Sequence, residues 1–298
     1  MLSLREPEQT IYLAPSLAAN VGYLLHRAFQ RLQALAATSA HGQHQGRELA
    51  IVARLLATGP QPQHELANAL TINRSVMVHL LDELEAIGFV ARERNPSDRR
   101  SHLVSATPAG ALSLEGAAPA LREADGRLTA RLSAASRERL FELLGQFAGA
   151  ALPDVVAPIS QTVSFRVARA HFLIAAAANT ALVPVGLDVR EYGLLTSVHD
   201  MAPCSQQQLA TLLDVSGPVI VELVDGLDAR GLIVRERNPD DRRSYALRLT
   251  AEAEPLLAGA RDAVRGVLAQ TSERLGAGGL EDLARLLAEM LGAQVAAA

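Results

Sequence analysis

The sequence lacks several features that mark other classes of protein. It has one cysteine, which excludes a disulfide within the chain and is typical of a reducing compartment. Its longest apolar run, Phe172 to Ala178, is far shorter than the roughly 20 residues of a membrane-spanning helix. The N-terminal segment MLSLREPEQT contains two glutamates and no apolar stretch, so no signal peptide is predicted. We therefore expect a cytoplasmic protein.

Signals for catalysis and for metal binding are missing as well. The sequence has no paired nucleophile and base, no glycine-rich phosphate loop and no cluster of metal ligands. His41 and His44 lie close together, but no third ligand is near them in sequence, so a solvated polar loop is the better interpretation. We therefore expect no enzyme activity, no cofactor and no metal.

A net positive charge is also absent. The formal net charge is −4 and the pI is about 6.1, so the total charge does not indicate nucleic-acid binding. With 298 residues, of which 49% are hydrophobic and 20% charged, the chain is long enough for two globular domains of about 150 residues. Its basic residues are concentrated in two short stretches, and local placement decides how a protein meets a phosphate backbone.

The sequence does contain one basic motif that occurs twice. Arg92–Ser101 reads RERNPSDRRS, and Arg235–Ser244, 143 residues later, reads RERNPDDRRS. From Arg47 to Gly110 the second copy aligns at the same offset without a gap, and 24 of 64 positions are identical, which indicates duplication of one domain. The Asn-Pro step favours a turn, so each motif is predicted to form the tip of a hairpin that exposes its arginines. For a single copy, an ordinary charged hairpin is the alternative.

Apolar periodicity and capping signals predict a mainly helical chain. Helices are expected at residues 16–40, 47–58, 63–70, 74–87 and 108–149, with a hairpin at 89–106 and a helix break at 132–136. The second copy is expected to have helices at 165–178, 188–199, 205–213 and 217–230, and a loop at 179–186. A hairpin at 232–249 and helices from 250 onward, with a break at 276–279, complete it. Residues 151–158 contain two prolines and are predicted to link a domain of residues 1–150 to one of residues 159–298.

This order of elements resembles the MarR family of winged-helix repressors. The resemblance is carried by Arg94–Arg100 with Thr107–Gly110, and by Arg237–Arg243 with Thr250, although Ala253 stands where the first copy has Gly110. It implies tandem winged helix-turn-helix domains, mainly α with two small β-hairpin wings, and a helical pseudo-dimerisation bundle. MarR-like proteins usually act as homodimers, so the resemblance implies that one chain here forms a pseudo-dimer that reads two half-sites. A homodimer of chains is the alternative.

The resemblance also implies which residues meet DNA. Each copy has a helix-turn-helix, here called its reading head, formed by helices 63–70 and 74–87 in the first copy and 205–213 and 217–230 in the second. The second helix of each reading head would lie in the major groove and the wing tip in the minor groove. In the first copy, Arg74 suits contact with a guanine. In the second copy, Glu222 stands at the position of His79, and a carboxylate there is repelled by phosphates. The first domain is therefore predicted to be the stronger base reader. The strand arginines are interpreted as backbone contacts, or alternatively as partners of the protein's own carboxylates. The predicted DNA-binding residues are Asn73, Arg74, Ser75, His79, Arg92, Arg94, Asp98, Arg99, Arg100, Ser216, Arg235, Arg237, Asp241, Arg242 and Arg243.

Family members commonly bind small aromatic acids between the long helices and the winged domain, so the resemblance implies a small aromatic or phenolic effector. The absence of tryptophan argues against the urate-responsive subgroup. The candidate ligand-binding residues, for each of which an interhelical or surface hydrogen bond is the alternative, are Tyr23, His26, Arg27, Arg166, Arg169, His171 and Tyr192. Cys204 precedes a helix N-terminus, which suits an oxidant sensor, but packing is the favoured interpretation.

The function that follows from this pattern is sequence-specific, DNA-binding regulation of transcription, in the form of a ligand-relieved repressor. The alternative is a tandem winged-helix module that serves an architectural or protein-interaction role, with non-specific or lost DNA binding. The weak second reading head and the acidic total charge motivate this alternative, and the two Asp-Arg-Arg wings argue against it.

Overall fold

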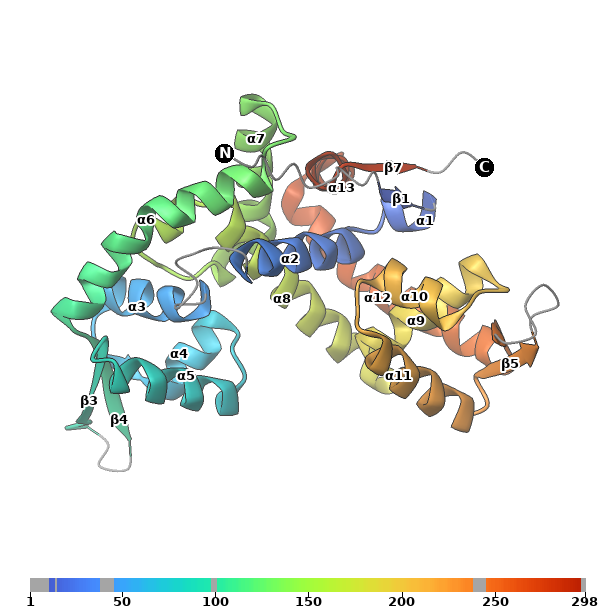
Figure 1. Ribbon diagram of the computed structural model, residues 1–298, viewed down its shortest axis with the longest axis horizontal. Helices are drawn as coiled ribbons and strands as arrows, with labels where there is room; N and C mark the ends of the chain where they lie inside the picture. The colour runs from blue at the N-terminus through green and yellow to red at the C-terminus, as the bar shows by residue number, and fades with distance from the viewer. Residues whose placement is uncertain (1–10, 14, 38–45, 98–100, 238–244, 296–298) are drawn as a thin grey trace, which may run out of the picture. The chain divides into compact units, whose positions relative to one another are not determined.

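The structure is a computed structural model that describes residues 11–13, 15–37, 46–97, 101–237 and 245–295 (Figure 1). These residues are mainly helical, with small β-hairpins, as predicted. They form two compact units: Met1–Leu173 together with Gly278–Ala298, and Ile174–Ala277. The first unit therefore includes the C-terminal segment of the chain. The predicted domain border at residues 151–158 stays a prediction.

The N-terminal helix is divided in two, so the prediction of one helix over residues 16–40 is wrong. Helix α1 (Pro15–Ala18) is followed by α2 (Val21–Ala37). The break arises because the Asn20 side chain accepts a hydrogen bond from the Tyr23 amide at 3.0 Å, and an asparagine in that position caps the next helix. The apolar stripe continues through the break, since Leu17, Val21 and Leu24 are all buried.

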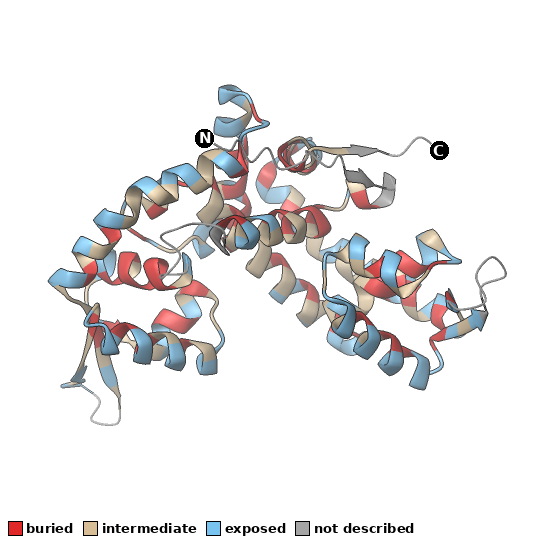
Figure 2. Ribbon diagram, viewed as in Figure 1, coloured by how far each residue is buried: buried red, intermediate tan, exposed pale blue. Residues whose placement is uncertain are grey.

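The first reading head follows the prediction closely. Its helices are α3 (Gly46–Thr58), α4 (Gln63–Leu70) and α5 (Arg74–Ala86). The wing consists of β3 (Val90–Arg94) and β4 (His102–Ala106), which pair antiparallel from Val90↔Ala106 to Arg94↔His102. A third, unpredicted strand, β2 (Gln61–Pro62), pairs with β4 to complete a sheet in the order β2-β4-β3. Leu66, Met77, Leu81 and Leu84 are fully buried and form the core of this head, on the inner faces of α4 and α5 (Figure 2).

Long helices complete the first unit: α6 (Pro108–Leu128), α7 (Ala134–Ala148), the first part of α8 (Val163–Leu182), and α13 (Gly279–Leu291), with short 3-10 turns η1 (Gly149–Ala151) and η2 (Ile159–Gln161). The break between α6 and α7 lies at residues 129–133, slightly earlier than predicted, because Ser133 caps α7 by accepting from the Ser136 amide. Strand β1 (Ile11–Leu13) pairs parallel with β7 (Ala293–Val295), which was not predicted.

Helix α13 packs against α2 and α7, so the last helix of the second copy lies in one bundle with helices of the first (Figure 1). Two contacts in this bundle join positions that are 143 residues apart, which is the offset of the repeat. The rings of Phe29 and Phe172 lie 5.0 Å apart between centroids. The Arg139 guanidinium donates from Nε to Asp282 Oδ2 at 2.9 Å. Equivalent residues of the two copies therefore contact each other.

The second unit repeats the reading head. After the end of α8 and the turn η3 (Val183–Val185) come α9 (Val189–Met201), α10 (Gln206–Leu213), α11 (Gly217–Ala229), β5 (Ile233–Arg237), β6 (Tyr245–Leu249) and α12 (Ala253–Leu275). The predicted starts of α9 and α10 are confirmed, and each is fixed by a capping box, Asp188 with Glu191 and Ser205 with Gln208. The break at residues 276–278 before α13 is confirmed too.

Helix α8 continues to Leu182, so the predicted loop over residues 179–186 begins too early. Asn179 lies inside the helix, where its side chain accepts from the Val189 amide at 2.8 Å and fixes the start of α9. The segment Val163–Val185 is long and apolar enough to cross a membrane by composition. However, Arg166 and Arg169 within it are hydrogen-bonded to protein groups, as expected of a helix packed in a protein core.

A threonine that precedes a helix joins each wing to the body of its domain. Thr107 donates to the Gly88 carbonyl and Thr250 to the Gly231 carbonyl, each at 2.7 Å. A Cβ at Gly110 would lie 2.3 Å from the Phe89 carbonyl oxygen, so only glycine fits there. The second copy has Ala253 instead, and α12 begins only at that residue, whereas α6 begins directly after Thr107.

Candidate nucleic-acid interface and adjoining cavity

Helix α5 presents a polar face to solvent. Its first turn is capped by Asn73, whose Oδ1 accepts from the Ser75 amide at 2.9 Å and from the Ser75 hydroxyl at 2.8 Å. Arg74, Ser75 and His79 are exposed, whereas Met77 between them is fully buried. The structure thus brings four of the predicted DNA-binding residues to one end of one helix.

A groove of about 630 Å³ runs between helices α4 and α5 on one side and the wing on the other. Three predicted residues, Arg74, Ser75 and Arg92, line it together. His64 of α4 and His102 of β4 also line it and were missed. A signal for His102 exists, because in an antiparallel hairpin it stands directly opposite Arg94.

The first arginine of each wing is turned onto its own recognition helix. Arg92 Nη1 lies 2.7 Å from both an Asp82 oxygen and a Glu85 oxygen. Arg235 pairs in the same way with Asp225 and, at 3.3 Å, with Asp228. This is the alternative that the sequence left open for the strand arginines, and it makes each pair a brace between wing and helix.

The remaining wing residues can be placed only in part. Arg94 lies at the exposed end of β3, and Arg237 ends β5, where only its backbone is described. Asp98, Arg99, Arg100, Asp241, Arg242 and Arg243 lie outside the described residues.

The second reading head has a different surface. Ser216 precedes α11, but its side chain makes no capping hydrogen bond. The reason lies two positions later, where Pro218 has no amide hydrogen to donate. Val221 and Glu222 are exposed at the positions that Val78 and His79 occupy in α5. The exposed residues in the first two turns of α11 therefore include no cation.

Cys204 occupies the position equivalent to Gln61 of β2. It forms a backbone bridge with Leu247, whose amide donates to the Cys204 carbonyl at 2.7 Å, and its side chain is buried. Burial raises the pKa of the thiol to about 11, so the thiol is protonated at neutral pH. This geometry fits the packing interpretation.

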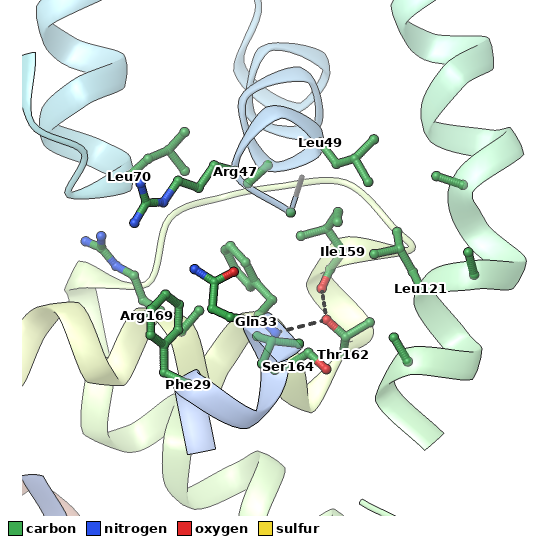
Figure 3. A pocket seen from close by; sticks show the side chains of 18 of the residues that line it. Phe29, Gln33, Arg47, Leu49, Leu70, Leu121, Ile159, Thr162, Ser164 and Arg169 are labelled. Atoms are coloured by element: carbon green, nitrogen blue, oxygen red, sulfur yellow. Dashed lines mark hydrogen bonds between the residues drawn. The ribbon is translucent and has the colours of Figure 1, made fainter. Parts of the chain in front are cut away.

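A cavity of about 350 Å³ adjoins the first reading head (Figure 3). It is lined by α2, α3, α6, α8 and the end of α4, which is where the resemblance implied an effector. Apart from Leu121, the lining positions on α6 are small and follow helical spacing, so they leave room: Ser113, Gly116, Ala117, Ala120 and Ala124. Among the described residues, the charged side chains in the lining are Arg47 and Arg169.

Of the seven predicted ligand-binding residues, Arg169 lines this cavity. His171 lies next to it, with its ring stacked on lining residue Phe29 at 4.7 Å between centroids. Burial, with contributions from the charges of His26 and Arg47, lowers the pKa of His171 to about 4. Arg166 instead crosses to α7, where it donates to the Phe141 carbonyl at 2.8 Å and covers the Phe141 ring.

The other four candidates are absent from the residues that line the described cavity. These are Tyr23, His26 and Arg27 of α2, and Tyr192, which packs against the core of the second unit. The most informative residues that sequence reasoning missed are Phe29, Gln33, Arg47, Thr162, Ser164 and Phe172. Helical spacing could have found one of them, since Phe172 follows Arg169 by three positions on the same face.

Comparisons with family models find one match in each of the two copies. A MarR family model matches residues 47–102, and a second MarR family model matches residues 185–244. Among solved structures, the transcriptional repressor CouR bound to a 23-mer DNA duplex is 29% identical, covers 44% of this chain and 94% of its own, and has a TM-score of 0.43. A MarR family regulator from Rhodococcus sp. RHA1 is 28% identical, with coverage of 46% and 96% and a TM-score of 0.43. CouR from Rhodococcus jostii RHA1 bound to p-coumaroyl-CoA is 29% identical, with coverage of 46% and 96% and a TM-score of 0.42.

Proposed function

This chain carries two tandem MarR-like domains, and from that premise we propose that it is a ligand-relieved transcriptional repressor that binds DNA as a single-chain pseudo-dimer. MarR family proteins are DNA-binding regulators of transcription rather than enzymes. We further assign a separate role in DNA binding to each copy, and we assign to an effector the role of weakening that binding.

The observation that carries the proposal is the exposed, capped N-terminal end of α5. Arg74 is the first residue of this helix, and a guanidinium can donate bidentately to guanine O6 and N7. Asn73 supports this end by capping, and the groove beside it contains His64 and His102 as further hydrogen-bonding side chains. We therefore assign base reading mainly to the first domain and DNA holding, through its wing, to the second.

Contacts between equivalent positions support the pseudo-dimer. In a two-fold dimer, a residue that touches its own counterpart lies at the symmetry axis. Phe29 with Phe172 and Arg139 with Asp282 are such pairs, and both are made within one chain. The charges are inverted between the copies, because α7 carries Arg139 and Glu142 where α13 carries Asp282 and Arg285. Two identical chains would place like charges together at this position, so the inversion favours pairing within the chain.

This pairing has a direct test. Arg139→Asp should weaken the bundle and raise the fraction of higher oligomers in sedimentation, whereas the swapped variant Arg139→Asp with Asp282→Arg should restore the 31.6 kDa monomer. Hydrogen bonds from Arg139 and Arg285 hold the pKa of Asp282 below its ordinary value, which is the sign expected for a charged partner. A wild-type chain that sediments as a stable dimer would contradict the single-chain pseudo-dimer.

The function is tested by selecting bound sequences from a random duplex pool with the purified full chain. We expect an enriched site with one strong half and one degenerate half. A symmetric site would contradict the division of work. No enrichment, with retention that disappears as salt rises, would instead support an architectural or partner-binding module. That second function is favoured by one observation, the exposed carboxylate of Glu222 on α11 at the position that His79 occupies in α5.

We place a small aromatic or phenolic effector in the cavity beside the first reading head. Its apolar walls suit a ring, and its two arginines suit an acidic group. We expect the protein to act in the cytoplasm, where its DNA lies.

A further inference from the structure

Arg169 is a buried cation that has no carboxylate partner among the described residues. Only 6% of the residue is exposed. Its Nε donates to the Ala151 carbonyl at 2.9 Å, and its Nη1 donates to the hydroxyl of Thr71. Both acceptors are neutral. A buried guanidinium stays charged, and buried charges are normally paired with an opposite charge, so this arrangement leaves a place for an anion.

Thr71 belongs to the turn of the first reading head. It caps the C-terminus of α4 in the left-handed region, with φ of 53°, two residues before Asn73 caps α5. The residues on either side of it, Leu70 and Ile72, line the cavity. The Arg169 hydrogen bond therefore holds the segment that sets where the recognition helix begins.

Arg169 faces the cavity as well as the turn. Figure 3 labels it together with Arg47, and the two come from different helices, α8 and α3. The described residues that line the cavity include no aspartate and no glutamate. An anion that entered would meet two guanidinium groups and no repelling carboxylate from this lining.

We propose that Arg169 couples the cavity to the reading head: an aromatic carboxylate bound in the cavity draws the guanidinium off Thr71 and releases the turn between α4 and α5. The exchange is favourable because a charge-assisted bond to a carboxylate replaces a bond to a neutral hydroxyl. Arg169 lies on a helix of the second copy, so this copy governs the base reader of the first. Arg169 is thus a positioning residue, and the inference rests on the proposed function.

The first test needs no ligand. Arg169→Met and Thr71→Val should each raise amide hydrogen exchange over residues 68–76 about tenfold and lower DNA affinity about tenfold, and the double variant should add little. Thr71→Ser keeps the hydroxyl and should keep the protection. Arg190→Met, which removes an exposed guanidinium paired with Asp188 in the second unit, is the control. Full protection in Thr71→Val would overturn the proposal even if Arg169→Met failed to fold.

The second test uses cinnamate as the probe and cinnamamide, which lacks the charge, as its matched control. Cinnamate should raise exchange over residues 68–76 in the wild-type chain and leave Arg169→Met unchanged. Equal effects of the two compounds, or no effect of either at millimolar concentration, would overturn the aromatic carboxylate as the trigger. Hydrogen exchange is measured without DNA, so this test does not depend on DNA binding. A chain that binds no DNA but shows increased exchange with cinnamate would refute the proposed function and still support the coupling between the cavity and the turn.

Discussion

The two recognition helices have the same length and different first turns. Helix α5 begins after Asn73, whose side chain accepts two hydrogen bonds, whereas α11 begins after Ser216, whose side chain caps nothing. Pro218 explains the difference, since proline at the second helical position removes the donor that the cap would use. The second head keeps a helix there because proline's fixed φ suits a first turn. The second helix therefore forms without the side-chain cap that begins the first.

Several positions on the inner faces of the two helices carry the same residue in both copies. Val76 and Val219, Leu80 and Leu223, and Leu84 and Leu227 are identical pairs on the inner faces of the two helices. Both wings keep the arginine brace, through Arg92 in one head and Arg235 in the other. The core also differs conservatively, with Ile220 and Val224 in place of Met77 and Leu81. The polar differences of the two helices lie at exposed positions, so they change which groups the second head presents to solvent.

The largest expected effect concerns the wings, which we take to be equivalent although the helices are not. Arg99→Ala and Arg242→Ala should each weaken DNA binding about tenfold, and the double variant about a hundredfold or more, because each removes a charge-assisted hydrogen bond of roughly 1.5–3 kcal/mol. The slope of log affinity against log salt should fall by roughly 0.9 for each phosphate that the variant no longer neutralises. Fluorescence anisotropy over a salt series measures both. Unchanged affinity in the double variant would refute the wing assignment.

Acid should weaken the first unit through His171. Its folded pKa of about 4 lies below the ordinary value of 6.5, so the unfolded chain takes the proton first as pH falls. The contribution of neutral His171 to the free energy of unfolding is therefore complete above pH 6.5. It declines between pH 6.5 and pH 4, by about 3 kcal/mol at most. Hydrogen exchange resolved along the chain should report this decline for residues of the first unit.

His171 has a physical reason for staying neutral. Its Nδ1 is buried and has no hydrogen-bond partner among the described residues, and Arg47 and His26 lie near enough to oppose a charge. His171→Phe should remove the acid sensitivity while keeping the ring stacked on Phe29. His199→Gln, in the second unit beside Glu254, is the control. The same decline in His171→Phe as in wild type would assign the effect to another group.

The difference between the heads should appear most directly in sequence preference. Arg74→Ala should cost about 1–3 kcal/mol on the preferred site and relax the preference at one base pair. Glu222→Ala, at an exposed position of α11, should leave the preference unchanged and raise affinity slightly, because it removes a charge that phosphates repel. Repeating the selection with both variants provides the measurement. Equal relaxation by both would mean that the second head reads bases too.

Local signals predicted most of the helices correctly, because caps act within one turn. Asp188 with Glu191 and Ser205 with Gln208 were recognisable as capping boxes from spacing alone. Asn20 was missed because it interrupts an apolar stripe whose period continues on either side. Strand β2 was missed because two residues show no alternation, and only pairing with β4 makes Gln61 and Pro62 a strand.

The site was harder to predict than the fold, because its parts come from distant segments. The cavity draws on α2, α3, α6 and α8, and nothing in the spacing of one helix tells which face meets another. Arg169 was recognisable as a cation in an apolar helix, but its partner Thr71 lies 98 residues away. For the wings, the sequence allowed Arg92 to contact either the DNA backbone or the protein's own carboxylates. The structure has the second arrangement, because Asp82 and Glu85 of α5 lie against the strand.

The smallest expected effect tests the caps themselves. Asn73→Ala removes a side chain that accepts two hydrogen bonds, so it should lower the free energy of unfolding by about 1 kcal/mol and loosen the start of α5. Ser216→Ala removes no capping bond and should cost less than about 0.5 kcal/mol. Pro218→Ser restores the missing amide donor and should let Ser216 cap α11, so that Ser216→Ala becomes costly in that background. Urea unfolding of the four variants measures the difference, and a large destabilisation by Ser216→Ala alone would show that the two helices begin more alike than their first turns indicate.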